Sequence, residues 1–114
     1  MHEASIAQSV LDIAGENCKK AGYSRIDSIR LRIGRASGVM TDALLFAFDA
    51  LKADTIAAGA TVIIDEIPVG GLCNSCGKDF LTDEAYILCC PECGGLSFKV
   101  NTGRELEILD MEVS

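Results

Sequence analysis

Two Cys-x-x-Cys pairs constrain this chain more than any other feature of its sequence. Cys73 and Cys76 form the first pair, Cys90 and Cys93 form the second, and residues 77–89 separate the two pairs. Each pair can fold as a tight turn, because the glycine that follows it lets the backbone turn away without a Cβ clash. Four thiolates on two such turns can surround one tetrahedral ion. The spacing therefore predicts a metal centre.

A shell of four protein ligands leaves no position open for water or substrate, so such a centre is ordinarily structural. We therefore expect structural zinc, Zn(II), at the four paired cysteines: Cys73, Cys76, Cys90 and Cys93. Iron is the main competitor, since the pattern also resembles the rubredoxin knuckle and a tetrahedron of sulfurs suits either metal. Colour distinguishes the two, because ferric thiolate is red and zinc thiolate is colourless.

Disulfides and redox chemistry account for the cysteines less well. No signal peptide is recognised, so the chain is expected in the cytoplasm, where thiols stay reduced. A thioredoxin-like redox pair would explain one Cys-x-x-Cys turn but not two. Of the remaining cysteines, Cys18 is expected to be a small core residue, and Cys89 a half-buried spare thiol beside the ligand Cys90.

Charge and hydropathy exclude several classes of function. Among 114 residues, ten Lys plus Arg stand against seventeen Asp plus Glu, and the formal net charge is −7. Such a chain is poorly suited to nucleic acid, which binds basic surfaces. No run approaches the roughly 20 apolar residues that span a bilayer, so no membrane association is expected. The sequence also holds no nucleophile and base couple and no phosphate-binding glycine loop, and we expect no enzymatic activity.

Hydrophobic periodicity predicts the elements outside the metal segment. Apolar residues at helical spacing indicate helices over 4–21 and 42–52, the second with Thr41 as its N-cap. Alternating or β-branched residues indicate three strands, over 25–33, 61–69 and 105–113. The predicted fold class is α+β: a small mixed three-stranded sheet with two helices, plus an inserted zinc-ribbon-like metal domain.

The position of the metal segment predicts two domains. Residues 71–101 form the expected zinc-binding ribbon domain, and residues 1–70 together with 102–114 form the expected α/β domain. Gly70 and Gly71 lie at the first boundary. Because glycine is conformationally permissive, we expect this pair to close the second strand and to act as a hinge.

The first three residues, Met1, His2 and Glu3, form a second candidate metal site, and His2 is the only histidine of the chain. The free amine of Met1, with the amide nitrogen and imidazole of His2, can close two fused chelate rings around one ion. Glu3 or water can occupy the fourth coordination position of the ion. A planar set of nitrogens suits Ni(II) or Cu(II) and suits zinc poorly. The alternative is a solvated terminal histidine, followed by an acidic residue in the first turn of a helix.

These features occur together in one known family. The opening Met1-His2-Glu3, the Leu44-x-Phe46-x-Phe48 segment, the two cysteine pairs and Gly103-Arg104-Glu105-Leu106 resemble the HypA/HybF family of hydrogenase maturation factors. The resemblance implies a nickel metallochaperone that delivers Ni(II) to the [NiFe]-hydrogenase large subunit, with a HypB-type GTPase as partner. It also implies nickel at His2 and Glu3 in the α/β domain, and structural zinc at the four paired cysteines.

The sequence leaves three questions open. It does not show whether urease maturation proteins are further partners, or whether the chain is a monomer or a dimer. Nor does it exclude a different class of function, a zinc-ribbon protein-interaction module without metal delivery. Nickel binding by an untagged chain distinguishes the two functions, because an N-terminal tag would destroy the candidate nickel site.

Overall fold

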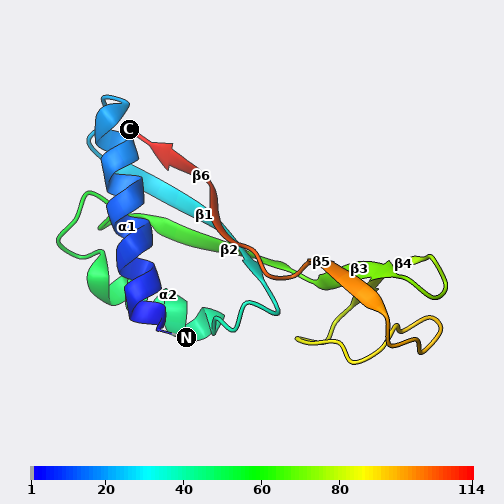
Figure 1. The fold of residues 1–114 in the computed structure, drawn as a ribbon. Coiled ribbons are helices and arrows are strands. Elements are labelled where there is room, and N and C mark those ends of the chain that lie inside the picture. The colour runs from blue at the N-terminus through cyan, green and yellow to red at the C-terminus, as the bar shows by residue number, and fades with distance from the viewer. Residues whose placement is uncertain (1) are drawn as a thin grey trace. The chain divides into compact units, whose positions relative to one another are not determined.

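The structure of this protein is a computed structural model that describes residues 2–114. Over these residues the elements follow the predicted order of helix, strand, helix, strand, metal segment and strand (Figure 1). The elements are α1 (Glu3–Lys20), β1 (Ile26–Gly34), α2 (Thr41–Leu51), β2 (Thr61–Ile67), β3 (Val69–Cys73), β4 (Asp79–Thr82), β5 (Phe98–Thr102) and β6 (Leu106–Val113). The strands form two sheets, with the orders β2-β1-β6 and β4-β3-β5. The predicted α+β class is confirmed.

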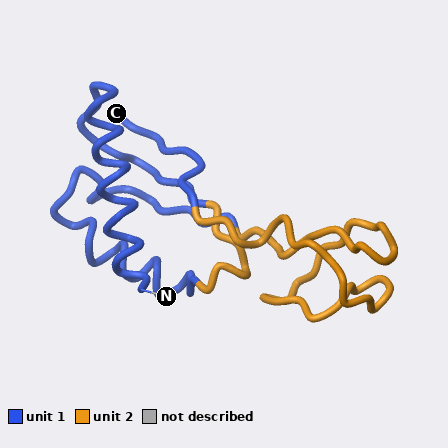
Figure 2. Tube along the Cα trace, viewed as in Figure 1, with its two compact units in different colours: residues 1–31, 39–65, 107–114 blue, residues 32–38, 66–106 orange. Residues whose placement is uncertain are grey.

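The described chain divides into two compact units (Figure 2). Unit 1 comprises the residues up to 31, residues 39–65 and residues 107–114, and it contains both helices. Unit 2 comprises residues 32–38 and 66–106, and it contains the sheet β4-β3-β5 and the four paired cysteines. Strands β1, β2 and β6 contribute residues to both units.

The core of unit 1 comes from one face of each helix and from alternate residues of β1. β1 buries Ile29 and Leu31 and leaves Arg30 between them half-buried, as alternation on a strand requires. α1 packs against α2. Eight helical residues line their buried faces: Ala7, Val10, Leu11, Ala14 and Cys18 of α1, and Leu44, Ala47 and Phe48 of α2. Neither helix of residues 2–114 is long and apolar enough to cross a membrane.

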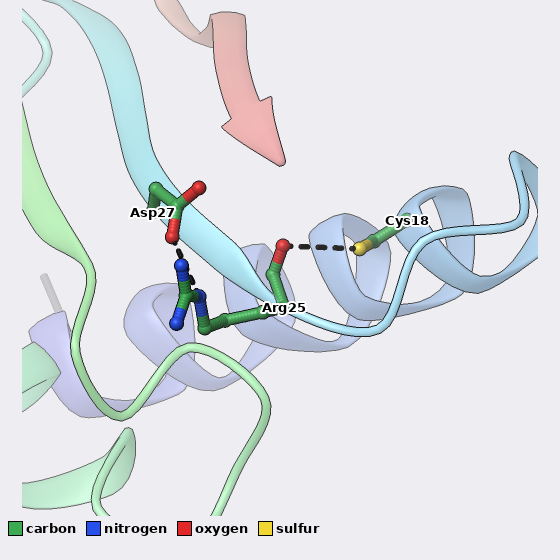
Figure 3. A network of polar contacts seen from close by, with 3 residues as sticks. All are labelled: Cys18, Arg25 and Asp27. Carbon is green, nitrogen blue, oxygen red and sulfur yellow. Dashed lines mark hydrogen bonds and ion pairs between the residues drawn. The ribbon is translucent and has the colours of Figure 1, made fainter. Parts of the chain in front are cut away.

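Cys18 is a fully buried core residue, as predicted. Its Sγ lies 3.7 Å from the backbone carbonyl oxygen of Arg25 and donates a weak hydrogen bond to it (Figure 3). The side chain of Arg25 in turn forms an ion pair of 2.9 Å with Asp27. This network joins the last turns of α1 to the start of β1, so Cys18 has a structural role.

The N-terminus of α2 differs from the prediction. Met40, not Thr41, is the N-cap, and its side chain makes no capping hydrogen bond. Instead, the carboxylate of Glu3 accepts a hydrogen bond of 3.0 Å from the backbone N–H of Met40. The acceptor comes from another helix, 37 positions away in the chain, so a local capping pattern does not indicate it.

The prediction that Gly70 and Gly71 form a hinge is wrong. Both glycines lie inside β3 and pair with β4 and β5. A Cβ on Gly71 would collide with the carbonyl of Lys99, and a Cβ on Gly70 would lie 2.7 Å from side-chain atoms of Leu81 and Thr102. The two glycines therefore permit close packing around a central strand.

Candidate metal sites

Two turns of the same construction carry the paired cysteines of unit 2. The N–H of Gly77 donates to the carbonyl of Cys73 at 3.0 Å, and the N–H of Gly94 donates to the carbonyl of Cys90 at 2.8 Å. Gly77 and Gly94 have φ values of 72° and 75°. Residues with a Cβ rarely adopt this left-handed region, so glycine is required at both places. The turn geometry inferred from the sequence is confirmed.

The two turns bring four sulfurs together. The Sγ atoms of Cys73, Cys76, Cys90 and Cys93 all lie within 4.8 Å of one another. The Cys73 and Cys93 sulfurs are 3.6 Å apart, and the Cys76 and Cys90 sulfurs are 3.9 Å apart. A tetrahedral ion with metal–sulfur bonds of about 2.3 Å needs sulfurs about 3.8 Å apart, whereas a disulfide needs about 2.0 Å. The arrangement therefore fits a tetrahedral thiolate metal centre.

Backbone N–H groups point at three of the four sulfurs. The donors are Cys76 to Cys73, Glu92 to Cys90, and Gly95 to Cys93, each at 3.4 Å. Such donors stabilise a thiolate, since they supply partial positive charge near the sulfur. The N–H of Cys76 is the main reason why the pKa of Cys73 falls to about 6, against the opposing effect of burial.

Crowding of the sulfurs raises the pKa of Cys93. The N–H of Gly95 lowers the pKa of Cys93, but the neighbouring sulfur of Cys73 and burial together outweigh it and raise the pKa to about 12. Four sulfurs at these distances cannot all be ionised at neutral pH without a cation between them. The cluster is therefore suited to a divalent ion, which would compensate the thiolate charge.

A small hydrophobic cluster in unit 2 includes the cysteines themselves. The buried residues of this cluster are Cys73, Phe80 and Cys90, and Cys76, Ile87 and Phe98 pack against them at partial burial. The rings of Phe80 and Phe98 meet edge to face, with centroids 6.0 Å apart. A core that includes three of the four candidate ligands has few apolar contacts apart from them, and small domains of this kind usually need a metal to fold.

Cys89 is exposed and lies outside the sulfur cluster. The expectation of a half-buried thiol is wrong in this respect. Its neighbour Cys90 is buried at 1% exposure, although the two are adjacent in the sequence. The two adjacent side chains therefore differ in burial, and the sequence pattern does not predict that difference.

The N-terminal candidate site is built differently. Met1 lies outside the described residues. His2 is exposed and occupies the N-cap of α1, with φ −87° and ψ 89°, and Glu3 is the first helical residue. The N–H of Met40, followed by that of Glu3 itself, lowers the pKa of the Glu3 carboxyl. Among residues 2–114 the structure brings no third metal-ligating side chain into a cluster with His2 and Glu3.

Comparison with known proteins covers both the four cysteines and the N-terminal residues. A family model for HypA, described as hydrogenase/urease nickel incorporation, metallochaperone, matches residues 1–113. The hydrogenase maturation factor HypA of Geobacter metallireducens is 42% identical over 113 residues, which cover 99% of each chain. The HypA of Roseiflexus sp. is 40% identical over 112 residues, which cover 98% of this chain and 91% of the relative.

Two solved structures have a similar fold. One is the solution structure of the Ni metallochaperone HypA from Helicobacter pylori, with a TM-score of 0.69 and 23% identity over 99% of this chain and 97% of that one. The other is a solution structure of HypA protein, with a TM-score of 0.72 and 23% identity over 100% of this chain and 97% of that one. At this identity the likeness concerns the fold.

Proposed function

Because the chain belongs to the HypA family of hydrogenase maturation factors, we propose that it is a nickel metallochaperone that binds Ni(II) at its N-terminus and delivers it to [NiFe]-hydrogenase. The family consists of metallochaperone maturation factors and not of enzymes. The observation that carries the proposal is the match of the family model to residues 1–113, which extends over both candidate metal sites.

The proposed nickel ligands are the α-amine of Met1, the amide nitrogen and imidazole of His2, and Glu3. The exposure of His2 supports this assignment, because a cargo ion must be reachable by the partner that removes it. The Glu3 carboxylate already accepts a hydrogen bond from the Met40 N–H, so it can serve as a weak nickel ligand that the partner displaces first. Release would then proceed by stepwise ligand exchange, with the amine and imidazole displaced last.

The four paired cysteines are proposed to hold structural Zn(II) in a ribbon domain of residues 71–101, with residues 1–70 and 102–114 as the nickel-binding domain. The sulfur separations of 3.6 and 3.9 Å support a tetrahedral ion. Zinc is preferred to iron because a maturation factor needs no electron carrier. When bound, the ion would compensate the charge of the four thiolates and cross-link the two turns.

The proposed partners are a HypB-type GTPase and the [NiFe]-hydrogenase large subunit, in the cytoplasm. Urease maturation proteins are further candidates, since the family description includes nickel incorporation into both enzymes. No GTP hydrolysis is assigned to this chain. The remaining alternative is a zinc-ribbon interaction module that delivers no metal.

The test is the metal content of the untagged protein supplied with both zinc and nickel. We expect one zinc that is retained on dialysis and one nickel that exchanges. Nickel affinity should fall about tenfold or more between pH 7.5 and 5.5, because α-amines and imidazoles in general take up protons in this range and must lose them to bind a metal. The pKa of Glu3 is lowered, so its carboxylate stays ionised throughout and does not cause the loss.

Three results would contradict parts of the proposal. Equal nickel affinity at the two pH values would exclude a site made of amine and imidazole. Uptake of zinc alone would exclude metal delivery and leave the interaction module. A red protein that contains iron would reassign the cysteine cluster.

A further inference from the structure

Helix α2 exposes a large aromatic side chain that the fold does not use. Phe46 is 76% exposed, although its neighbours Ala47 and Phe48 are buried in the core of unit 1. Leu44, on the other side of Phe46, is buried completely. The apolar face that α2 turns toward the core is therefore complete without Phe46. An exposed aromatic of this kind is typical of protein-binding surfaces.

Phe46 lies at the centre of an apolar surface with acidic flanks. Residues three and four positions apart share one side of a helix, so Asp42, Leu45, Phe46 and Asp49 lie together; we call these four residues the Phe46 face. Leu45 is 36% exposed, and both aspartates are exposed. An apolar centre between two carboxylates has the composition of a binding site with a charged rim.

The acidic flank is only partly neutralised within the chain. The Nζ of Lys52 lies 3.3 Å from a carboxylate oxygen of Asp49. The lysine side chain is only 18% exposed, however, and its Nζ donates a hydrogen bond of 2.7 Å to the carbonyl of Ala60. The Asp49 side chain is 76% exposed. Its carboxylate can therefore also meet a cation on a partner.

The same helix begins at the candidate nickel site. Met40, the N-cap of α2, donates its N–H to the carboxylate of Glu3 at 3.0 Å, and both residues belong to unit 1. Met40 is itself 68% exposed, and no side chain of α2 caps the helix. A protein bound along α2 would therefore approach the residues proposed to hold the metal.

We propose that the Phe46 face is the docking surface for the protein that takes nickel from this chain. The occupant is a protein with an apolar pocket for the Phe46 ring and basic side chains at the rim of that pocket. This proposal rests on the proposed function. Charge favours a basic protein partner over the alternatives. A second copy of this chain has a net charge of −7 and would place carboxylates against the carboxylates of the Phe46 face, and an anionic membrane would repel these carboxylates as well.

The test compares Phe46→Ala with Ile13→Ala, an exposed apolar residue of α1 that is 51% accessible. Each untagged, zinc-loaded variant is titrated against two purified probes, the HypB-type GTPase and the nickel-free hydrogenase large subunit. Phe46→Ala should weaken binding to at least one probe by about 30-fold or more, the effect of a hot-spot aromatic. Ile13→Ala should change it less than about threefold, as most exposed residues do. Asp42→Asn with Asp49→Asn should weaken binding more at low salt than at high salt.

The nickel affinity of each variant, measured alone, separates this proposal from the proposed function. If the wild-type chain binds no nickel, the proposed function fails. If it binds nickel and Phe46→Ala binds both probes as tightly as wild type, the docking proposal fails and the proposed function stands. Absence of wild-type binding to both probes would also overturn the docking proposal. So would dissociation of a wild-type dimer by Phe46→Ala in sedimentation, because the occupant would then be a second copy.

Discussion

In the four-cysteine cluster of unit 2 the candidate ligand atoms are held by the backbone, whereas at the N-terminus of unit 1 they extend from the first turn of a helix. Three of the cluster sulfurs have an N–H donor at 3.4 Å, and both turns depend on a glycine at positive φ. His2 is exposed, and the carboxylate of its neighbour Glu3 accepts a hydrogen bond of 3.0 Å from the backbone N–H of Met40.

The difference separates retention of a metal from exchange of a metal. The turn glycines and the backbone N–H donors place the four sulfurs in a closed shell, which favours retention of the ion. An exposed ligand such as the His2 imidazole is reached more easily by a partner, so an ion bound there is exchanged more easily. Under the proposed function, unit 2 keeps its ion and unit 1 exchanges it. Three changes test whether the two regions differ in this way.

The largest effect is expected from Cys90→Ser. Structural zinc contributes on the order of 10–16 kcal/mol of apparent binding free energy in small zinc domains, and that free energy supports folding. The variant should lose its zinc and most of the amide protection in residues 66–106, measured by elemental analysis and hydrogen exchange. Cys89→Ser is the matched control, because Cys89 is exposed and outside the cluster. A zinc-free Cys89→Ser protein would show that the ligand assignment is wrong.

His2→Ala should have the next largest effect, confined to nickel. Loss of an outer partner of a metal ligand typically costs 10–100-fold in affinity, so loss of the ligand itself should cost more than about 100-fold. Zinc content and helicity should stay at wild-type values, since His2 is exposed and is not among the buried core residues. Calorimetry on the untagged protein measures the affinity. Unchanged affinity would place nickel elsewhere and remove the contrast between the two regions.

Gly71→Ala should have the smallest effect of the three and should act on unit 2. Its Cβ would collide with the backbone carbonyl of Lys99 in β5, and overpacking of this kind costs about 1–3 kcal/mol. Gly15→Ala in α1 is the control, because no atom lies within 4 Å of the added Cβ and alanine favours a helix by about 1 kcal/mol. Hydrogen exchange should show weaker protection in unit 2 for the first variant and stronger protection in α1 for the second. Equal changes in both units would contradict the packing role of Gly71.

Much of the fold could be predicted because it depends on local patterns. The helical spacing of apolar residues in α1 indicates Val10, Ala14 and Cys18 as core residues, and the alternation around Arg30 in β1 indicates Ile29 and Leu31. The structure buries all five, whereas Ile13, which has the same helical spacing, is 51% exposed. The cysteine turns could be predicted in the same way, since the Cys-x-x-Cys-Gly pattern contains both the sulfurs and the glycine with positive φ that the turn requires. In each case the residues that determine the structure are neighbours in the chain.

The errors concern contacts between distant segments. Gly70 and Gly71 were assigned to a hinge from their composition, but β4 and β5 lie so close on either side of β3 that a Cβ would not fit. The exposure of Cys89 also differs from the predicted half-burial, because burial depends on which other segments pack against a side chain. A glycine in a crowded strand and a glycine in a flexible joint look alike in a sequence, because both are defined by what surrounds them.

The sequence by itself determined the two helices, the α+β class, the two cysteine turns and the resemblance to HypA, because periodicity and turn chemistry are properties of adjacent residues. Only the tertiary structure decided that four sulfurs meet within 4.8 Å, that Glu3 caps α2 through Met40, and that Phe46 stays outside the core. These facts depend on which segments meet after folding. Packing and hydrogen bonding between distant segments determine which residues come into contact, and no short stretch of residues encodes these contacts.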